Sequence, residues 1–313
     1  MASSSRSRTA EVEEDVETIL ASGLVTPTRR GWKGTIAVDM DDVLCQTNAT
    51  IVHMHNELFD TQPPLTLADF KNYLYWMNRG WGTPEETVDM VAQLYQGGLY
   101  MRAPPVPGAK EALHRLKDLG YNLVIITARS ENQRAGTEDW IAEYLPDIFD
   151  EIHFTGAFQH LEPTREEKEG HVARKAVVSH HKRSKAEIIH STSSLFLIDD
   201  SSENAYDVAT STYPHDGPIK VLLFGDYPWN AVVHGDPSFP KSAVEGMTYH
   251  EKVKNGLLEE YESIRKKKLE KKWLPPGVER AGDWEKVLGW VERFDSDKQR
   301  SQAEVKGGDA EGI

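Results

Sequence analysis

Short, continuous apolar runs alternate with helical patterns along most of the chain. Such runs are typical of parallel strands that are buried on both faces. They occupy residues 35–44, 121–129, 194–201 and 219–225, with a shorter run at 148–154. The helical patterns between them follow the order of βαβ units. The sequence therefore predicts an α/β fold with a Rossmann-like, doubly wound parallel sheet.

The pattern from residue 47 to 103 is helical and rich in aromatic residues. Proline and glycine pairs divide it into three or four short helices. An insertion directly after the first strand would lie over the strand ends as a lid. We therefore expect a core at 31–48 and 104–295 and a small helical cap at 49–103. The polar ends, 1–30 and 296–313, are expected to be a disordered lead and tail.

Further helices are expected at 135–150, from residue 185, and at 203–209, 247–273 and 284–294. The polar segment 155–184 carries four histidines and several basic residues. Their irregular spacing favours a solvated loop or surface helix over a metal site. A basic patch for an anionic ligand stays open as an alternative.

Composition limits the class of protein. The 313 residues carry a net charge of −14, which argues against a general nucleic-acid binder. The single cysteine, Cys45, excludes an internal disulfide, and its acidic neighbours favour a buried thiol over a nucleophile. No apolar run approaches the roughly 20 residues of a membrane span. We expect a cytoplasmic protein without a membrane partner.

Acidic side chains follow the first strand. Asp39 and Asp41 are separated by one residue, so they would point the same way along an extended strand. Their charges would repel unless a cation or a shared proton relieves them. Mg²⁺ suits this position because it binds carboxylates together with phosphate oxygens. An ordinary acidic turn is the alternative.

Polar groups at two other strand ends argue against that alternative. Thr127 closes the second apolar run, and Asp199 and Asp200 close the third. Lys185 opens the helix that leads into the third strand, and for this reason it is preferred over Lys182 as the positive charge of the site. Three strands that each end in groups used by phosphate chemistry are improbable by accident.

These residue types fit phosphoryl transfer, which needs a nucleophile, a cation and donors around the phosphate. Asp39 can attack phosphorus to give an acyl-phosphate. Asp41 can protonate the leaving oxygen and later take a proton from water. Thr127 offers a hydroxyl and Lys185 a charge, and the remaining metal ligands are Asp199 and Asp200.

Together these segments resemble the four motifs of the haloacid dehalogenase-like superfamily. Residues 39–43, Thr127, Lys185 and residues 199–200 occur in the order of those motifs. Asp41 fills the acid/base position of the phosphatase branch, and the helical insertion resembles a type 1 cap. Residues 38–41, 197–200 and 228–230 are similar to the small-cap 5′-nucleotidases, the group of the deoxyribonucleotidases. The resemblance covers about residues 34–230 and the last helix.

The resemblance implies roles for individual residues. Asp39 would be nucleophile and metal ligand, and Asp41 the acid/base with its backbone carbonyl on the metal. Thr127 and Lys185 would hold the phosphate. The magnesium ligands would be completed by Asp200, with Asp199 beside it.

Three features depart from the nucleotidase pattern. Asp42 stands where these enzymes usually have glycine, segment 155–184 is long, and 247–273 has no obvious counterpart.

The expected function is a magnesium-dependent phosphomonoester hydrolase that acts on a nucleotide or another small phosphorylated metabolite. One alternative is a polynucleotide phosphatase or RNA-repair enzyme that uses the basic segments 165–183 and 265–272. Another is a non-catalytic binding protein that keeps the fold. The sequence argues against this second alternative, because a dead site need not keep all of the motif residues.

Overall fold

The structure is a computed structural model that describes residues 32–156, 183–212 and 218–308, with side chains as far as residue 298. The chain divides into two compact units, residues 1–33 and residues 34–313. All that follows concerns the second unit. The expected lead at 1–30 and nearly all of the basic segment 155–184, including Lys182, lie outside the described residues.

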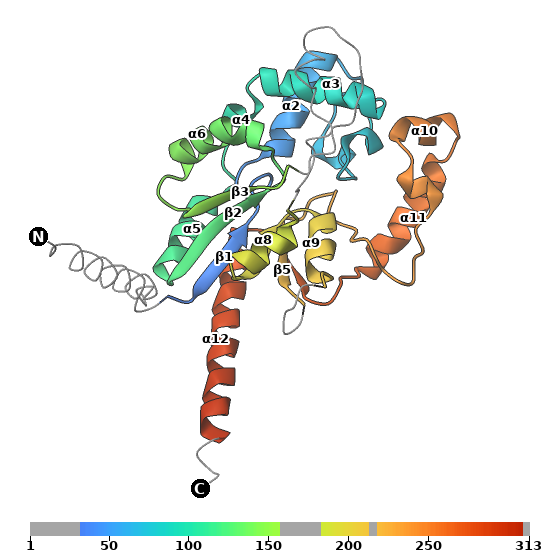
Figure 1. Ribbon diagram of the computed structural model, residues 1–313. Helices are drawn as coiled ribbons and strands as arrows, with labels where there is room; N and C mark the ends of the chain where they lie inside the picture. Colours follow the sequence, from blue (N-terminus) through green and yellow to red (C-terminus); the bar gives the residue numbers. More distant parts are fainter. Residues whose placement is uncertain (1–31, 157–182, 213–217, 309–313) are drawn as a thin grey trace, which may run out of the picture. The chain divides into compact units, whose positions relative to one another are not determined.

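A parallel sheet of six strands forms the centre of this unit (Figure 1). The strand order is β3-β2-β1-β4-β5-β6, and every neighbouring pair is parallel. The strands are β1 (Gly34–Val38), β2 (Tyr121–Thr127), β3 (Glu151–Phe154), β4 (Ser194–Asp199), β5 (Lys220–Phe224) and β6 (Val278–Ala281). All five residues of β1 are buried, as the apolar run predicts. The expected α/β, doubly wound fold is confirmed.

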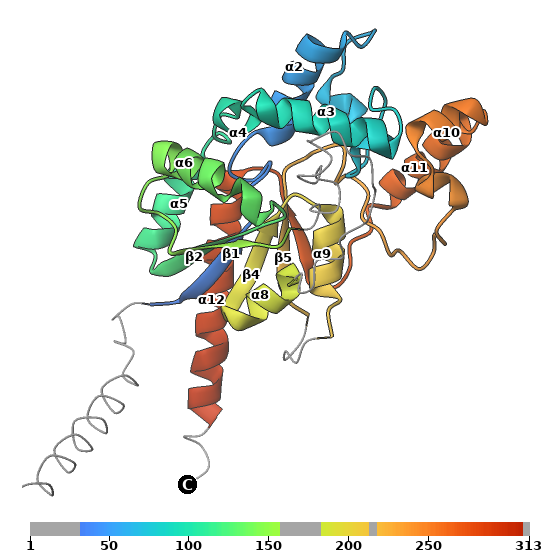
Figure 2. The same ribbon diagram turned by 45° about the horizontal axis from the view of Figure 1, so that its top comes forward.

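Helices cover both faces of the sheet (Figures 1 and 2). One face packs against α5 (Ala109–Asp118), α6 (Arg134–Tyr144) and α12 (Trp284–Gly308). The other packs against α8 (Lys185–Ser191) and α9 (Ser202–Ala209). In α5 the buried positions 109, 112, 113 and 116 recur at helical spacing, so one stripe of the helix faces the sheet.

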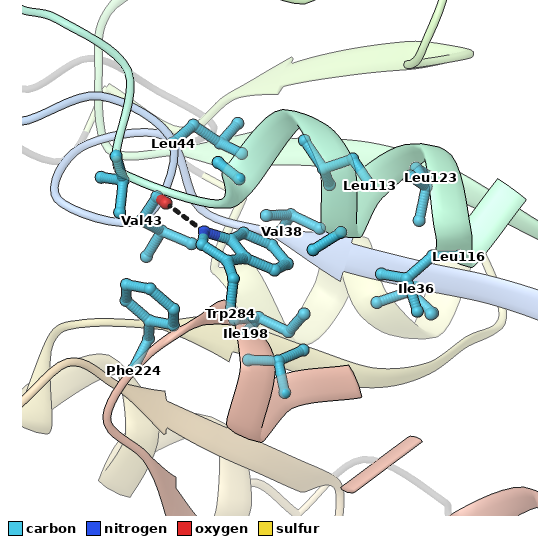
Figure 3. Packing of buried hydrophobic residues seen from close by; sticks show 14 of the residues in the cluster. Ile36, Val38, Val43, Leu44, Leu113, Leu116, Leu123, Ile198, Phe224 and Trp284 are labelled. Carbon is cyan, nitrogen blue, oxygen red and sulfur yellow. Dashed lines mark hydrogen bonds between the residues drawn. The ribbon is translucent and has the colours of Figure 1, made fainter. Parts of the chain in front are cut away.

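Trp284, the first residue of α12, anchors the loop that follows the acidic motif (Figure 3). Its indole Nε1 donates a hydrogen bond of 3.0 Å to the backbone oxygen of Val43. The ring is 1% exposed and packs with Phe224, at 5.4 Å between ring centroids. The start of the last helix thus holds the turn that begins at Asp39.

The segment between β1 and α5 is helical and has its own small core. It contains α2 (Thr47–Phe59), α3 (Pro84–Gln96) and α4 (Leu99–Arg102), with 3₁₀ turns at Leu67–Asp69 and Tyr75–Met77. These helices lie beyond the carboxyl ends of the strands (Figure 1). Trp81 is fully buried at the centre of this core, stacked on Tyr75 at 4.7 Å and in contact with His55 at 4.7 Å. We call residues 49–103 the cap.

Several element bounds differ from the sequence expectation. The helix expected at 135–150 ends at Tyr144, because Pro146 disfavours helical backbone at Leu145. The strand expected from 148 begins at Glu151. The last helix continues to Gly308. The edge strand β6 was not predicted, since its sequence places two exposed charged residues between two buried ones.

The helix expected at 247–273 is two helices, α10 (Tyr249–Lys254) and α11 (Leu258–Lys271). Gly256 separates them with a φ of +68°, a left-handed conformation that glycine adopts without strain. No helix in the described ranges is both long enough and apolar enough to cross a membrane.

Candidate active site

A cavity of about 1170 Å³ lies between the carboxyl ends of the central strands and the cap. Three of the predicted carboxylates, Asp39, Asp41 and Asp200, line it. They come from the ends of β1 and β4, which are neighbours in the sheet. The chain leaves β1 toward β2 on one side and later returns through β4 on the other. This is the kind of crevice in which open α/β sheets bind their ligands.

Asp39 is the first residue after β1, and its backbone N–H donates to Ile198 of β4 at 2.9 Å. Its carboxylate Oδ1 lies 2.7 Å from Nζ of Lys185, which also lies 2.6 Å from Oδ2 of Asp199. Lys185 opens α8, whose amino end is capped by Ser184. Lys185 therefore bridges two carboxylates from adjacent strands. A buried ammonium needs such opposite charges, because an uncompensated buried charge is strongly destabilising.

Burial dominates the ionisation of this pair. Desolvation raises the pKa of Asp39 to about 7, Lys185 opposes the rise, and the charges of Asp199 and Asp41 add to it. Burial by itself lowers the pKa of Lys185, but the two facing carboxylates outweigh burial and raise that pKa. The lysine therefore stays charged beside Asp39.

Three carboxylates converge at a possible cation site. Asp39, Asp199 and Asp200 each place one oxygen within 4.8 Å of the others, and all three are buried. Burial, followed by the charge of Asp42, raises the pKa of Asp200 well above its usual range. Oxygen donors of this kind suit a hard divalent cation such as Mg²⁺. The residues present therefore fit the expected metal.

The carboxylate of Asp41 has a different partner. Arg129 holds it by two contacts, Nε to Oδ2 at 3.0 Å and Nη2 to Oδ1 at 2.6 Å, and the Thr47 hydroxyl donates to Oδ1 at 2.5 Å. Burial would raise the pKa of Asp41, but the charge and hydrogen bonds of Arg129 outweigh burial and lower it. The expected repulsion between Asp39 and Asp41 is thus relieved by two separate cations of the chain, Lys185 and Arg129.

Thr127 lies at the end of β2 and is completely buried. Its hydroxyl accepts a hydrogen bond of 3.2 Å from the backbone N–H of Arg129. The following residues, Ala128 to Ser130, line the cavity, whereas Thr127 itself does not. Its expected role as a phosphate donor stays a prediction.

Asp42 shows why an acid can stand at the position that is usually glycine. Its φ is +58°, the left-handed conformation that glycine and, less often, aspartate adopt. Both of its carboxylate oxygens accept from the backbone N–H of Asn48 in the first turn of α2, at 3.0 and 3.3 Å. The Asp42 side chain thus accepts a hydrogen bond from a backbone N–H group at the amino end of α2. A glycine at this position could not accept it.

Cys45, which follows closely, is also buried. Burial and the charge of Asp41 raise the pKa of its thiol, as expected for a thiol without a nucleophilic role.

Trp229 was not predicted as a site residue. Its indole Nε1 donates to Oδ2 of Asp200 at 2.6 Å, and its ring is stacked on Tyr227 at 4.4 Å. The next residue, Asn230, donates to the backbone oxygens of Asp200 and Phe224 at 2.9 and 2.8 Å. The loop after β5 therefore fixes Asp200 from two sides. Its sequence signals are the Trp-Asn pair beyond a buried strand and the resemblance of residues 228–230 to the small-cap 5′-nucleotidases.

Aromatic and amide side chains surround the acids. The aromatic residues lining the cavity are Tyr73, Tyr75, Trp76, Tyr95, Tyr100 and Trp229. The amide residues are Asn48, Asn72, Gln93, Gln96, Asn132 and Gln133. Flat rings and paired donors and acceptors are the groups that bind a planar polar ligand.

Comparison with known proteins gives a family match over part of the chain. Residues 33–162 match the family model of the 5′ nucleotidase, deoxy (pyrimidine), cytosolic type C protein. No curated protein gives a significant match. The matched segment contains β1, the cap, β2 and β3, and with them Asp39, Asp41 and Thr127.

Solved structures resemble the chain at low identity. L-2-haloacid dehalogenase from Xanthobacter autotrophicus is 11% identical, with a TM-score of 0.43, and the match covers 82% of this chain and 98% of that one. D,D-heptose 1.7-bisphosphate phosphatase from B. bronchiseptica is 13% identical, with a TM-score of 0.38 and coverage of 84% and 99%. A HAD family hydrolase from Deinococcus radiodurans R1 is 12% identical, with a TM-score of 0.39 and coverage of 73% and 96%. At these values the likeness carries no information on chemistry.

The family match and the clustered motif residues agree with each other. The parallel sheet brings Asp39, Lys185, Asp199 and Asp200 together, and the matched segment contains Asp39, Asp41 and Thr127 of the first two motifs. The expected resemblance is thus found over residues 33–162, where the chain is similar to the cytosolic type C 5′ nucleotidases.

Proposed function

We propose that this phosphatase hydrolyses a nucleoside 5′-monophosphate through an aspartyl-phosphate on Asp39, with Mg²⁺ held by Asp39, Asp199 and Asp200. The observation that carries the proposal is the ion-paired cluster at the cavity. Asp39 lies 2.7 Å from Lys185, and the two further carboxylates lie within reach of one cation. A nucleophile, a fixed positive charge and a metal site thus occupy one place.

The chemistry follows from these positions. A carboxylate oxygen of Asp39 forms a bond to phosphorus while the bond from phosphorus to the ester oxygen breaks, and water then cleaves the acyl-phosphate. Lys185 balances negative charge at the phosphate. Bound Mg²⁺ supplies further neutralisation of the phosphate charge.

Asp41 lines the same cavity and is the candidate acid and base. In the first step it gives a proton to the leaving oxygen, and in the second it takes one from the attacking water. Arg129 favours the ionised form, which the second step requires. An anionic phosphate nearby raises the pKa of Asp41 and so favours the protonated form, which the first step requires.

The cavity supports a nucleotide substrate. Its volume of about 1170 Å³ lies just above the usual range of small-molecule sites, roughly 300–1,000 Å³, and leaves room for a nucleotide. Rings such as Tyr75 and Trp76 can stack on a base, and amides such as Asn48 and Gln96 can bind its polar edge. The matched family carries the word nucleotidase in its description.

The polynucleotide alternative is weakened by the basic run 265–272. Arg265 donates to the backbone oxygen of Pro228 at 2.7 Å. Lys268 pairs with Glu245 at 2.5 Å, and Lys271 pairs with Asp236 at 3.0 Å. Three cations of this run are therefore used inside the fold. The other basic segment, 165–183, lies almost entirely outside the described residues.

The test is hydrolysis of a panel of phosphate esters with and without Mg²⁺. The panel contains nucleoside 5′-monophosphates, sugar phosphates and a 5′-phosphorylated oligonucleotide. We expect metal-dependent release of phosphate from the monophosphates and its loss in Asp39→Asn, which cannot form the acyl-phosphate. Asp118→Asn, on the exposed end of α5, is the matched control. Turnover by Asp39→Asn would exclude this nucleophile, and preference for the oligonucleotide would favour the polynucleotide alternative.

A further inference from the structure

The hairpin of α10 and α11 stands beside the cap in both views of the ribbon (Figures 1 and 2). It lies beyond residue 162, where the family match ends. Of the contacts that α11 makes, two reach segments that line the cavity. One goes to the cap and the other goes to the loop after β5.

The contact with the cap is made by Tyr261. Its hydroxyl donates to Oδ1 of Asn72 at 2.8 Å, and Asn72 lines the cavity. The residues next to this pair in sequence, Lys71 and Glu262, form an ion pair at 2.5 Å. The α10 helix also packs against the 3₁₀ turn Tyr75–Met77. The cap segment from 71 to 77 is therefore held along its length.

The contact with the core is made by Arg265, one turn further along α11. Its Nη2 atom donates to the backbone oxygen of Pro228 at 2.7 Å. Pro228 precedes Trp229, whose indole holds Asp200. Tyr227, which precedes it, donates from its hydroxyl to the backbone oxygen of Asp42 at 2.8 Å. Arg265 thus contacts the loop whose side chains donate hydrogen bonds to Asp200 and Asp42.

Tyr261 is itself held in place. It is 7% exposed, and the ammonium of Lys252 on α10 lies 4.1 Å from the centre of its ring. Lys252 is fully buried, and among the described residues its Nζ atom has no hydrogen-bond partner. The aromatic ring therefore helps to compensate this buried charge, together with the nearby carboxylates of Glu245, Glu251 and Glu262. A tyrosine fixed in this way presents its hydroxyl to Asn72 in one orientation.

We propose that α11 is a strap between the cap and the loop after β5, in which Tyr261 and Arg265 act as positioning residues for two residues that line the cavity, Asn72 and Trp229. Neither Tyr261 nor Arg265 lines the cavity. Their effect on a substrate passes through Asn72 and Trp229. The strap holds these two lining residues in place and so sets the fit of a bound ligand. The kinetic part of this inference rests on the proposed function, whereas the structural part does not.

Hydrogen–deuterium exchange of the full chain tests the structural part. Tyr261→Phe removes one hydroxyl and leaves the ring on Lys252. The amides of residues 71–78, two of which donate to the side chain of Asn78, should exchange about fivefold faster, as expected for the loss of one hydrogen bond. Arg265→Leu should speed exchange in 227–230 to a similar degree. Tyr249→Phe and Lys266→Leu, on α10 and on the exposed side of α11, are the matched controls.

The kinetic arm separates the strap from the proposed chemistry. With a nucleoside monophosphate that the unaltered chain hydrolyses, Tyr261→Phe should raise KM several-fold while kcat changes less than about twofold, because its partner Asn72 is not one of the reacting groups. Exchange at 71–78 and 227–230 that matches the controls would overturn the strap, whatever the activity. A chain without any phosphatase activity would overturn the proposed function, while faster exchange in the variants would still support the strap.

Discussion

The ring of Tyr100 lies over the guanidinium of Arg129, with 3.9 Å from the Arg129 Cζ atom to the ring centroid. Tyr100 belongs to α4 in the cap, and Arg129 belongs to the core and holds Asp41. A cation over an aromatic face gains electrostatic stabilisation, more so where water is excluded. The candidate acid/base is thus oriented by a cation that the cap itself covers.

Replacing Arg129 by lysine should impair turnover more than binding. Lysine keeps the charge but cannot make the paired contacts, so the carboxylate of Asp41 loses its fixed orientation. We expect kcat to fall about tenfold or more, with a smaller change in KM. Arg134→Lys, on an exposed arginine that pairs with Glu131, is the control. Equal kinetics in Arg129→Lys and the control would contradict this role.

Replacing Trp229 by phenylalanine should weaken binding of Mg²⁺. The ring can stay stacked on Tyr227, but the hydrogen bond to Asp200 is lost. Residues that orient a metal ligand typically change affinity about 10- to 100-fold when they are replaced. Isothermal titration with Mg²⁺ measures the effect without any substrate. Trp273→Phe, at a half-buried tryptophan outside the cavity, should bind as the unaltered chain does. Unchanged affinity in Trp229→Phe would show that the indole does not position Asp200.

The cap should lose stability at acidic pH through His55. Burial lowers the pKa of His55 below its usual value of 6.5 and the charge of Arg79 adds to this, whereas the hydrogen bond between its Nε2 atom and the backbone oxygen of Gly80 opposes it. The unfolded chain therefore takes up the proton first. The stabilisation is complete above about 6.5 and is lost as the pH falls through the lowered pKa of the folded state.

Thermal unfolding at about pH 8 and about pH 5 measures this effect. His55→Phe keeps an aromatic ring against Trp81 but cannot be protonated, so its unfolding temperature should change less between the two pH values. His114→Gln, at an exposed site on α5, should keep the full pH dependence. An identical pH dependence in all three chains would exclude His55 as the source.

Trp284→Phe should lower the free energy of unfolding by about 2 kcal/mol. The change removes the hydrogen bond to Val43 and leaves a void in the core between α12 and the sheet. Denaturation by urea measures it. A midpoint equal to that of the unaltered chain would show that the core closes around the smaller ring and that Val43 finds another donor.

Local pattern accounts for the parts that could be predicted. The run that became β1 is buried on both faces, and the stripe of α5 recurs at helical spacing, so each element could be predicted from its own residues. The strand ends then follow, because parallel strands point their carboxyl ends the same way. This placed Asp39 near Asp199 and Asp200 without any knowledge of contacts.

Partners distant in sequence account for the parts that could not be predicted. Arg129 meets Asp41 across 88 positions, and Trp229 meets Asp200 across 29. Neither pair has a local signature. The break at Gly256 was missed because charged residues continue on both sides of it. Thr127 was expected to face the phosphate from its place at a strand end, but the direction of a side chain there depends on how the backbone turns next.

The sheet order has a consequence for the chain as it is synthesised. Asp39 emerges from the ribosome early, while Asp200 follows 200 − 39 = 161 residues later. The strand that carries the later acids inserts directly beside β1, in the middle of the finished sheet. Until that strand arrives, the candidate cation site lacks two of its three carboxylates. A nascent or truncated chain that ends before β4 therefore lacks the complete group of acids that the proposed metal site needs, however well its first half is folded.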